Sequence, residues 1–495
     1  MCCKSGFARR TAALALCAVA GLLLPHSPAR AQGNTQLLEF HGGHYRFTGR
    51  AGVALTGIYD PLFGSARLLA GGQASAANVC SNPGALAWNR RLSGSLSFRP
   101  GFGLNLDKFL DMKTLVRPEV DDAIADIRAP GMTLTDEDYP DMQATIGPVP
   151  LLSGALALPV GPAVLGFSLY SPFTAHLSAV GSGMEMRLKT VDEEDPTREV
   201  TFFGSNDLTL EMSWRLLSYA ASVSCSPAPS LGLGFSIEGL SGSVDLAGRL
   251  DTQGIMSVAG IERAFNDPND PWTNSLFAEA SASYSGTTAR LHLGGQYRLS
   301  DRTAVGLSMQ TGTTLRMTGE ASVVQYALPG FNMNAGEDED MLDPTAISLD
   351  EPTRTRLIDN PTGRSVDVHL PATTRLSFTT GSRSVAAAVS LAFQTGSFQV
   401  THALQGKAHE SRYAFELSRG VQFDLDLRLW GFFIGLGYSS ATFRQTTPDG
   451  SESQTFPFPR VVLGYTQKIT SRLFFGSRFL ALPDPVGGVA LGFAL

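Results

Sequence analysis

The stretch Met142–Met184 reads MQATIGPVPLLSGALALPVGPAVLGFSLYSPFTAHLSAVGSGM and contains no Asp, Glu, Lys or Arg. It is long enough for two membrane helices, which need about 20 residues each. However, a proline inside a helix removes a hydrogen bond and clashes with the preceding turn, and this stretch contains five: Pro148, Pro150, Pro159, Pro162 and Pro172. A membrane protein without spanning helices has one remaining option, a closed β-barrel, because only closure satisfies every backbone group in lipid.

Apolar and polar residues alternate through much of the chain. From Leu92 to Leu106 most even positions are apolar, such as Leu96 and Phe98, whereas Ser95 and Ser97 lie between them. This period of two fits a strand that faces lipid on one side and a polar lumen on the other. The pattern recurs at 208–216, 231–239, 289–299, 305–317, 421–427 and 489–495, with short turns at 226–229 and 300–302. The sequence therefore predicts an all-β fold, an antiparallel transmembrane β-barrel with strands of about ten residues.

The composition agrees with this fold class. Of 495 residues, 52 are Gly and only 17% are charged, whereas soluble domains carry about 25% charge. The mean hydropathy is +0.03, and the hydrophobic share of 43% is too ordinary for a helical membrane bundle. The net charge of -7 excludes the basic footprint of a nucleic-acid-binding protein.

Residues 1–31 have the pattern of an export signal. Basic residues precede the apolar run Thr11–Leu24, and Ala29-Arg30-Ala31 supplies the small residues that signal peptidase needs. Lipoprotein processing at Cys17 is the alternative, although Leu16 is a poor residue at that position. Cleavage after Ala31 would remove four basic residues and no acids, so the mature net charge would be -11.

Long acidic, proline-bearing segments separate the predicted strands. They fit the outward loops of a barrel, which are longer than the periplasmic turns. These segments are 117–141, 190–198, 261–274 and 332–360.

The sequence contains none of the catalytic signatures for a nucleophile elbow, a phosphate loop or a zinc protease. The pair in His41-Gly42-Gly43-His44 supplies too few ligands for a metal, and the acidic runs at 192–195 and 337–340 lack the spacing of a calcium loop. We therefore expect no enzyme, no cofactor and no metal. Cys80 and Cys225, which remain after signal cleavage, are expected to be unpaired. Trp214 and Trp430 are expected in an interfacial aromatic girdle.

Several pieces of the sequence resemble the FadL family of long-chain fatty-acid transporters, and they occur in the family's order. The N-terminal piece, Gly64–Arg67 through Ala74–Asn78 and then Ser81-Asn82-Pro83-Gly84-Ala85-Leu86-Ala87, is similar to the family's hatch, although Gly84 stands where members have Ala in Asn-Pro-Ala. The other pieces are Val164–Phe173, which resembles a strand leading into a Pro-Phe kink, Leu293–Leu299 with Ala304–Ser308, and His369–Thr373.

The resemblance implies a barrel of fourteen strands in the outer membrane of a two-membrane bacterium. It implies a plug over residues 32–90, with Asn82, Pro83 and Ala85 in the hatch, and a barrel over residues 91–495. Outer-membrane strands usually end in Phe or Trp, so the final Leu495 departs from the pattern that the assembly machinery reads, and Phe493 is the alternative signal.

The resemblance also implies passive transport of long-chain fatty acids or other hydrophobic molecules, with membrane lipid and the hydrophobic ligand as partners and no nucleic acid. Because Pro172 lacks the N–H that a ladder needs, it must lie at a bulge or gap. Ser171, Pro172 and Phe173 are therefore the candidate for a sideways exit into lipid. Two alternatives remain open: a related scaffold that holds secreted partner proteins, and a porin for small polar solutes.

Overall fold

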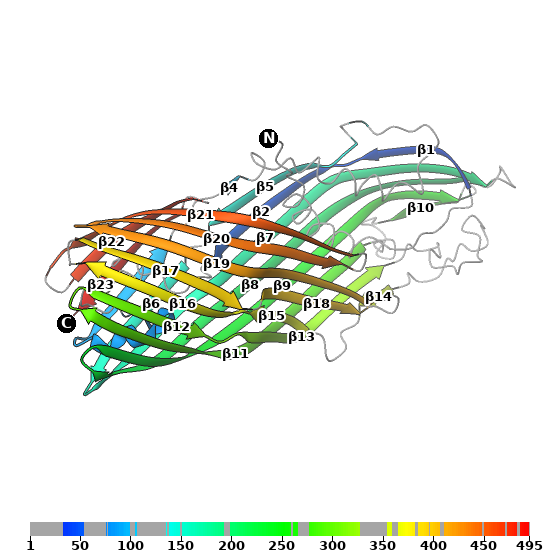
Figure 1. The fold of residues 1–495 in the computed structure, drawn as a ribbon. Helices are drawn as coiled ribbons and strands as arrows, with labels where there is room; N and C mark the ends of the chain where they lie inside the picture. The colour runs from blue at the N-terminus through cyan, green and yellow to red at the C-terminus, as the bar shows by residue number, and fades with distance from the viewer. Residues whose placement is uncertain are drawn as a thin grey trace.

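The computed structural model describes residues 33–53, 76, 78–99, 104–105, 135, 138–148, 151–192, 199–258, 261–265, 277–326, 354–358, 365–381, 385–395, 397–405, 410–447, 450–470, 473–482 and 486–494. Long tilted strands form a barrel over most of these residues (Figure 1). The expected signal peptide, residues 1–31, and the first part of the hatch resemblance, residues 64–75, lie outside the described residues.

The wall of the barrel consists of strands that follow one another in chain order. These strands are β3 (Ser93–Arg99), β6 (Leu151–Val160), β7 (Ala163–Asp192), β8 (Glu199–Ala228), β9 (Leu231–Val258), β11 (Phe277–Ser300), β12 (Thr303–Gln310), β13 (Thr313–Tyr326), β15 (Ser365–Leu370), β16 (Ala372–Gly381), β17 (Val385–Thr395), β18 (Ser397–Gln405), β19 (Glu410–Leu429), β20 (Phe432–Thr447), β21 (Gly450–Lys468), β22 (Leu473–Leu482) and β23 (Val486–Ala494). The remaining strands are β1 (Gly33–His41), β2 (His44–Val53), β4 (Leu104–Asn105), β5 (Asp141–Pro148), β10 (Ile261–Phe265) and β14 (Arg354–Ile358).

The wall strands pair antiparallel with their neighbours, and the pairings run in a circuit. Leu96 of β3 lies opposite Gly154 of β6 on one side and opposite Leu491 of β23 on the other. The first and last wall strands are thus paired, as the predicted antiparallel barrel requires. The expected number of fourteen strands stays a prediction, because breaks between β12 and β13, β15 and β16, and β17 and β18 allow each pair to be counted as one strand or two.

The strands are longer than the sequence predicts. β7 and β8 have 30 residues each, whereas about 9–11 residues cross a bilayer. At about 3.4 Å per residue, such a strand extends about 100 Å. The period-two pattern continues past the apolar part with polar residues, so parts of the expected loops are strand. These parts are 190–192 in β7, 261–265 in β10 and 354–358 in β14.

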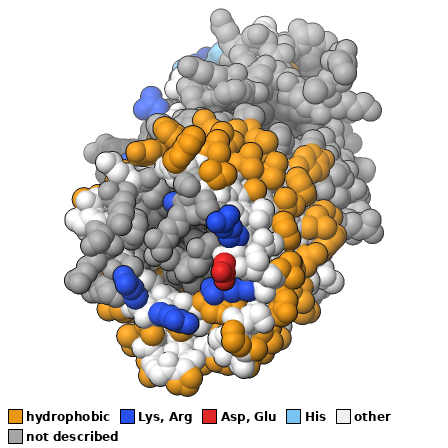
Figure 2. Space-filling view, turned by 60° about the vertical axis from the view of Figure 1, so that its left-hand side comes forward, with side chains coloured by type: hydrophobic (Ala, Val, Ile, Leu, Met, Phe, Trp, Pro, Cys, Tyr) orange, Lys and Arg blue, Asp and Glu red, His pale blue; other side chains and the backbone are white. Residues whose placement is uncertain are grey.

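Large hydrophobic side chains cover the outer surface near the end of the barrel where the short turns lie, which we call the turn end. Figure 2 views this end, and hydrophobic side chains surround the barrel there. In β8, Leu217 and Tyr219 are exposed on this outer face, while Ser218 between them is fully buried. This is the apolar-out, polar-in alternation of a transmembrane barrel. Other exposed members are Leu96, Leu169, Ile237, Leu293, Leu307, Phe378, Phe423, Leu436 and Leu463.

The first two strands lie in the sheet rather than inside the barrel. β1 pairs with Glu185–Asp192 of β7, and β2 pairs with Phe173–Ser182 of the same strand. β2 also pairs with β5, in parallel. Of the segment expected to form the plug, residues 33–53 are therefore strands of the sheet.

A second part of that segment, residues 78–89, lies inside the barrel, and we call it the inner segment. It consists of the short helix α2 (Asn78–Ser81) and the 3₁₀ helix η2 (Pro83–Trp88). Its side chains Val79 and Leu86 are fully buried against residues of β6, β7 and β8, including Ala157, Val164 and Ala220. Among the described residues, no helix is long and apolar enough to cross a membrane.

Candidate functional site

Asn82 and Pro83 shape the inner segment as their sequence predicts. A residue before proline is biased toward extended backbone, and Asn82 has φ -154° and ψ 90°. Its Oδ1 accepts a hydrogen bond from the Gly84 N–H at 3.1 Å, which caps η2. Its Nδ2 donates to the Gly295 main-chain oxygen of β11 at 3.3 Å. One side chain therefore both begins the 3₁₀ helix and attaches it to the wall.

Small residues of the wall let the backbone of the inner segment approach closely. A Cβ at Gly84 would lie 2.5 Å from the Gly294 oxygen, and a Cβ at Gly294 would collide with Asn82. This explains why the sequence has Gly at the third position of its Asn-Pro-Gly, where the resembled family has Ala. The Pro83 oxygen accepts a hydrogen bond from Ser224 Oγ at 2.6 Å. Ala85 is buried as well.

Both ends of the inner segment also contact the wall. Cys80 Sγ lies 3.2 Å from Ser168 Oγ of β7. At the other end, the Arg298 guanidinium lies over the Trp88 ring at 4.0 Å from its centroid, which is a cation–π contact. Cys80 is buried and Cys225 is exposed, and both are free thiols.

Ser171 and Pro172 mark the point where β7 changes its neighbour. The ladder between β6 and β7 ends at Tyr170, opposite Ser153, and the ladder between β2 and β7 begins at Phe173. On the other side, the pairing of β7 with β8 skips from Tyr170 to Phe173. Pro172 therefore lies at a bulge, as the missing N–H predicts.

The residues beside Pro172 connect the bulge to the rest of the barrel. Ser171 Oγ donates to the Leu216 main-chain oxygen of β8 at 2.8 Å and lies 2.8 Å from Thr174 Oγ1. The Phe173 ring contacts the Trp214 ring edge-on, with 4.9 Å between centroids. The expectation that Trp214 belongs to an outer aromatic girdle is wrong. Trp214 is on the inward-facing phase of β8, with Leu216 and Ser218, and packs against buried apolar residues. By contrast, Trp430 is exposed at the turn between β19 and β20.

An apolar cluster covers the inner faces of β8, β9, β11, β13 and β15, farther from the turn end than the inner segment. We call it the upper apolar cluster. Its centre is closed to solvent, since Leu240, Leu315 and Met317 are fully buried. Phe173 and Trp214 pack against it, so it reaches the bulge in β7. Its members are Leu216, Leu240, Tyr284, Leu315, Met317, Ala321, Val366 and Val368.

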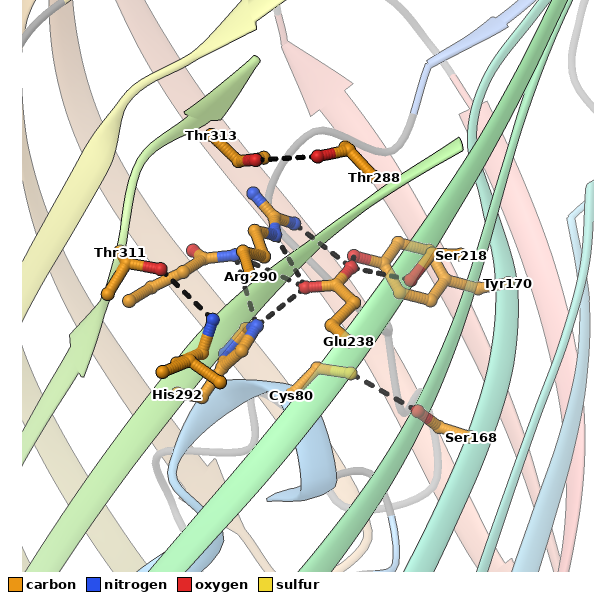
Figure 3. A network of polar contacts seen from close by, with 12 residues as sticks. Cys80, Ser168, Tyr170, Ser218, Glu238, Thr288, Arg290, His292, Thr311 and Thr313 are labelled. Atoms are coloured by element: carbon orange, nitrogen blue, oxygen red, sulfur yellow. Dashed lines mark hydrogen bonds and ion pairs between the residues drawn. The ribbon is translucent and has the colours of Figure 1, made fainter. Parts of the chain in front are cut away.

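A polar network centred on Glu238 lies beside Cys80 of the inner segment (Figure 3). It borders the upper apolar cluster, because Leu240 is two residues from Glu238 in β9 and Leu216 is two residues from Ser218 in β8. The Glu238 carboxylate is fully buried and accepts hydrogen bonds from Tyr170 Oη at 2.9 Å and from Ser218 Oγ. From β11, Arg290 donates through Nε at 2.6 Å and Nη2 at 3.0 Å. His292 Nε2 contacts the same carboxylate. Four residues from three other wall strands thus converge on one buried charge.

Glu238, Arg290 and His292 are not among the site residues that the sequence pattern predicts. A signal was present, because each lies on the inward-facing phase of an otherwise apolar strand, as in Ile237-Glu238 and Leu291-His292. The pattern could not indicate that they meet, since Glu238 is separated from Arg290 by 52 residues of chain.

The histidine pair near the N-terminus lies beside two carboxylates, Asp138 just before β5 and Asp141 at its start. His41 Nδ1 lies 3.7 Å from Asp138 Oδ1, and His44 Nδ1 lies 3.3 Å from Asp141 Oδ2. Within the described part of the chain, no group of three or more His, Cys, Asp or Glu side chains could hold a metal ion.

Comparisons with known proteins find similarity in structure only. No family model matches the chain, and no curated protein sequence matches it. A FadL homologue of Pseudomonas aeruginosa has a TM-score of 0.45 and 14% identity, covering 89% of this chain and 99% of that one. The monoaromatic hydrocarbon channel CymD has a TM-score of 0.43 and 11% identity, covering 90% and 99%. The P. putida toluene transporter TodX has a TM-score of 0.40 and 13% identity, covering 88% and 99%. Each of these similarities extends over most of both chains.

Proposed function

We propose that the protein is a passive channel for hydrophobic molecules, long-chain fatty acids or other apolar compounds, in the bacterial outer membrane. The observation that carries this proposal is the order of layers inside the barrel. The inner segment occupies the lumen toward the turn end, and an apolar cluster lies beyond it. A polar solute gains nothing from such a cluster, whereas burying ten methylenes could gain about 8 kcal/mol before ordering costs.

A molecule held in this way must leave without returning to water. Exit into water would forfeit the free energy gained by burial, so a sideways exit into lipid is the favourable route. Phe173 packs against the upper apolar cluster, and Pro172 beside it interrupts the ladder to β8. The packing of Phe173 and the interrupted ladder support Ser171, Pro172 and Phe173 as the exit. Asn82, Pro83 and Ala85 would hold the movable inner segment below.

The test is uptake of labelled apolar compounds into proteoliposomes with the inner segment locked or free. Cys80 Sγ and Ser168 Oγ are 3.2 Å apart, so Ser168→Cys offers a disulfide from the inner segment to β7. Cys225→Ser in the same chain prevents mispairing. We expect oxidation to stop uptake and reduction to restore it, while the Cys225→Ser chain is indifferent to both.

Two outcomes would contradict the proposal. Absence of uptake in every state would reject transport and favour the scaffold. Passage of small polar solutes at rates that oxidation does not change would favour the porin.

A further inference from the structure

We propose that Glu238 determines ligand specificity by compensating the charge of Arg290 beside the upper apolar cluster, so that the path accepts uncharged apolar molecules over carboxylates of the same length. This inference rests on the proposed channel function and narrows its substrate class.

Glu238 forms an ion pair with Arg290, which is the cation that a carboxylate ligand would need. Arg290 Nε and Nη2 both donate to the Glu238 carboxylate. With its side-chain oxygen turned toward Arg290, Gln310 accepts from Nη1 at 2.7 Å. Arg290 thus directs its Nε and Nη2 donors at Glu238 and its Nη1 at Gln310. The Arg290 side chain is only 12% exposed.

The other donors of the network also point at Glu238. Tyr170 and Ser218 donate their hydroxyl hydrogens to Oε1, and His292 Nε2 contacts Oε2. The single hydroxyl donors of Tyr170 and Ser218 are therefore both used by Glu238. Arg290 and Glu238 compensate each other's charge, so the ion pair has no net charge to offer a ligand.

The network borders the place where a ligand would lie. Leu240 follows Glu238 on the same face of β9, and Leu216 precedes Ser218 on the same face of β8. Both leucines belong to the upper apolar cluster. A hydrocarbon in contact with them needs no hydrogen bond. A carboxylate there would lose its hydration, and the Arg290 cation that could compensate it is already paired with Glu238, which is unfavourable in a buried site.

Glu238→Gln tests whether this carboxylate sets the preference for a hydrocarbon over a carboxylate ligand, because the substitution removes the charge and keeps the shape of the side chain. Arg290 then carries an uncompensated charge with donors free for a ligand carboxylate. We expect carboxylate affinity to rise at least about tenfold, the scale of a hydrogen bond to a charged group, and affinity for the uncharged ligand to stay unchanged.

The experiment uses Trp214, which packs against the upper apolar cluster. Detergent-folded protein is titrated with 1-bromododecane or 12-bromododecanoate, whose bromine quenches a nearby indole, and Trp214→Phe defines the signal from this site. The compared quantity is the ratio of the two affinities in each chain, since both ligands partition into the same micelles.

Two further chains control for folding and for loss of a carboxylate elsewhere. Glu238→Gln with Arg290→Gln restores an uncharged network, so its ratio should return to that of the wild type even if the single variant is less stable. Glu279→Gln removes an exposed carboxylate of β11 and should leave the ratio unchanged.

The proposal is overturned if wild type prefers the carboxylate, if the ratio is the same in Glu238→Gln, or if neither ligand quenches Trp214. The channel function is tested separately by the Ser168→Cys chain. If its uptake stops on oxidation, any of these three results rejects only the specificity role of Glu238 and not the channel function.

Discussion

The Ser171 hydroxyl donates a hydrogen bond to the Leu216 main-chain oxygen at 2.8 Å, across the ladder between β7 and β8. The ladder skips two residues of β7 here, between Tyr170 and Phe173, and one of the skipped residues is a proline that cannot donate. A side chain thus takes the place of a backbone donor. At this point the connection between the two wall strands depends on a group that can rotate away.

Replacing Pro172 tests whether this bulge is the exit. Pro172→Ala restores an N–H, which can extend the ladder and narrow the gap, so we expect slower uptake of apolar compounds into proteoliposomes with no loss of folded barrel. Heat-dependent migration on gels measures the folded fraction.

The matched control is Pro159→Ala, which changes a proline of the neighbouring strand β6, opposite Val164 and near the turn end. Its uptake should equal that of the wild type. Equal uptake by Pro172→Ala as well would mean that molecules leave elsewhere, and the exit assignment alone would fall.

Asn82→Ala tests the inner segment. The substitution removes the cap on the Gly84 N–H and the bond to the Gly295 oxygen, which should weaken the docking of the segment by about 1–2 kcal/mol. We expect higher conductance in planar bilayers and an unchanged melting temperature of the barrel. Asn82→Asp keeps the accepting oxygen and loses the donor, so its conductance should be intermediate. A conductance equal to wild type in both variants would assign Asn82 to an ordinary turn.

Gly84→Ala tests the close approach of the inner segment to the wall. The new Cβ would lie 2.5 Å from the Gly294 oxygen, and such overpacking costs about 1–3 kcal/mol. We expect the segment to shift away from β9 and β11 and to expose Cys80. Gly154→Ala is the control, because its nearest neighbours would be 3.8 Å away.

Thiol labelling in a Cys225→Ser background reports this shift. Burial raises the pKa of the Cys80 thiol to about 12, so at pH 8 the docked thiol is almost entirely protonated and should not react with N-ethylmaleimide. Exposure would lower the pKa toward its usual value, and labelling in Gly84→Ala should become rapid. Slow labelling in both chains would show that the wall yields instead of the inner segment.

Much of the fold could be predicted because every strand of a barrel wall has the same alternation of apolar and polar residues. The alternation around Leu96 and Phe98 is sufficient to place lipid on one side of β3, and Pro172 predicts its own bulge. The strand lengths could not be predicted in this way. The pairing of β7 with β1 and β2 replaces acidic loop with ladder, and this depends on residues 33–53 returning to a strand that is more than a hundred residues away.

The polar network could not be predicted for a related reason. In the sequence, Glu238 is one more polar residue on the strand face that points into the lumen. Its role depends on Tyr170 of β7 and Arg290 of β11, which the closed sheet brings beside it. The register between the strands determines whether these side chains lie close together. Register depends on how the strands pair in the closed sheet, so it cannot be inferred from one strand's sequence.

The bulge at Pro172 also sets the phase of β7. Before it, buried side chains fall on even numbers, as at Ser168 and Tyr170, and after it they fall on odd numbers, as at Ala175 and Ala179. One extra residue therefore separates the two halves of the strand, and the bulge absorbs it. Deletion of Pro172 alone would bring both halves into a single alternation and leave each side chain on its present face, whereas deletion of Ser171 as well would turn one half inside out. The interruption in the wall is thus one residue in size, and a single deleted codon is enough to make the strand continuous.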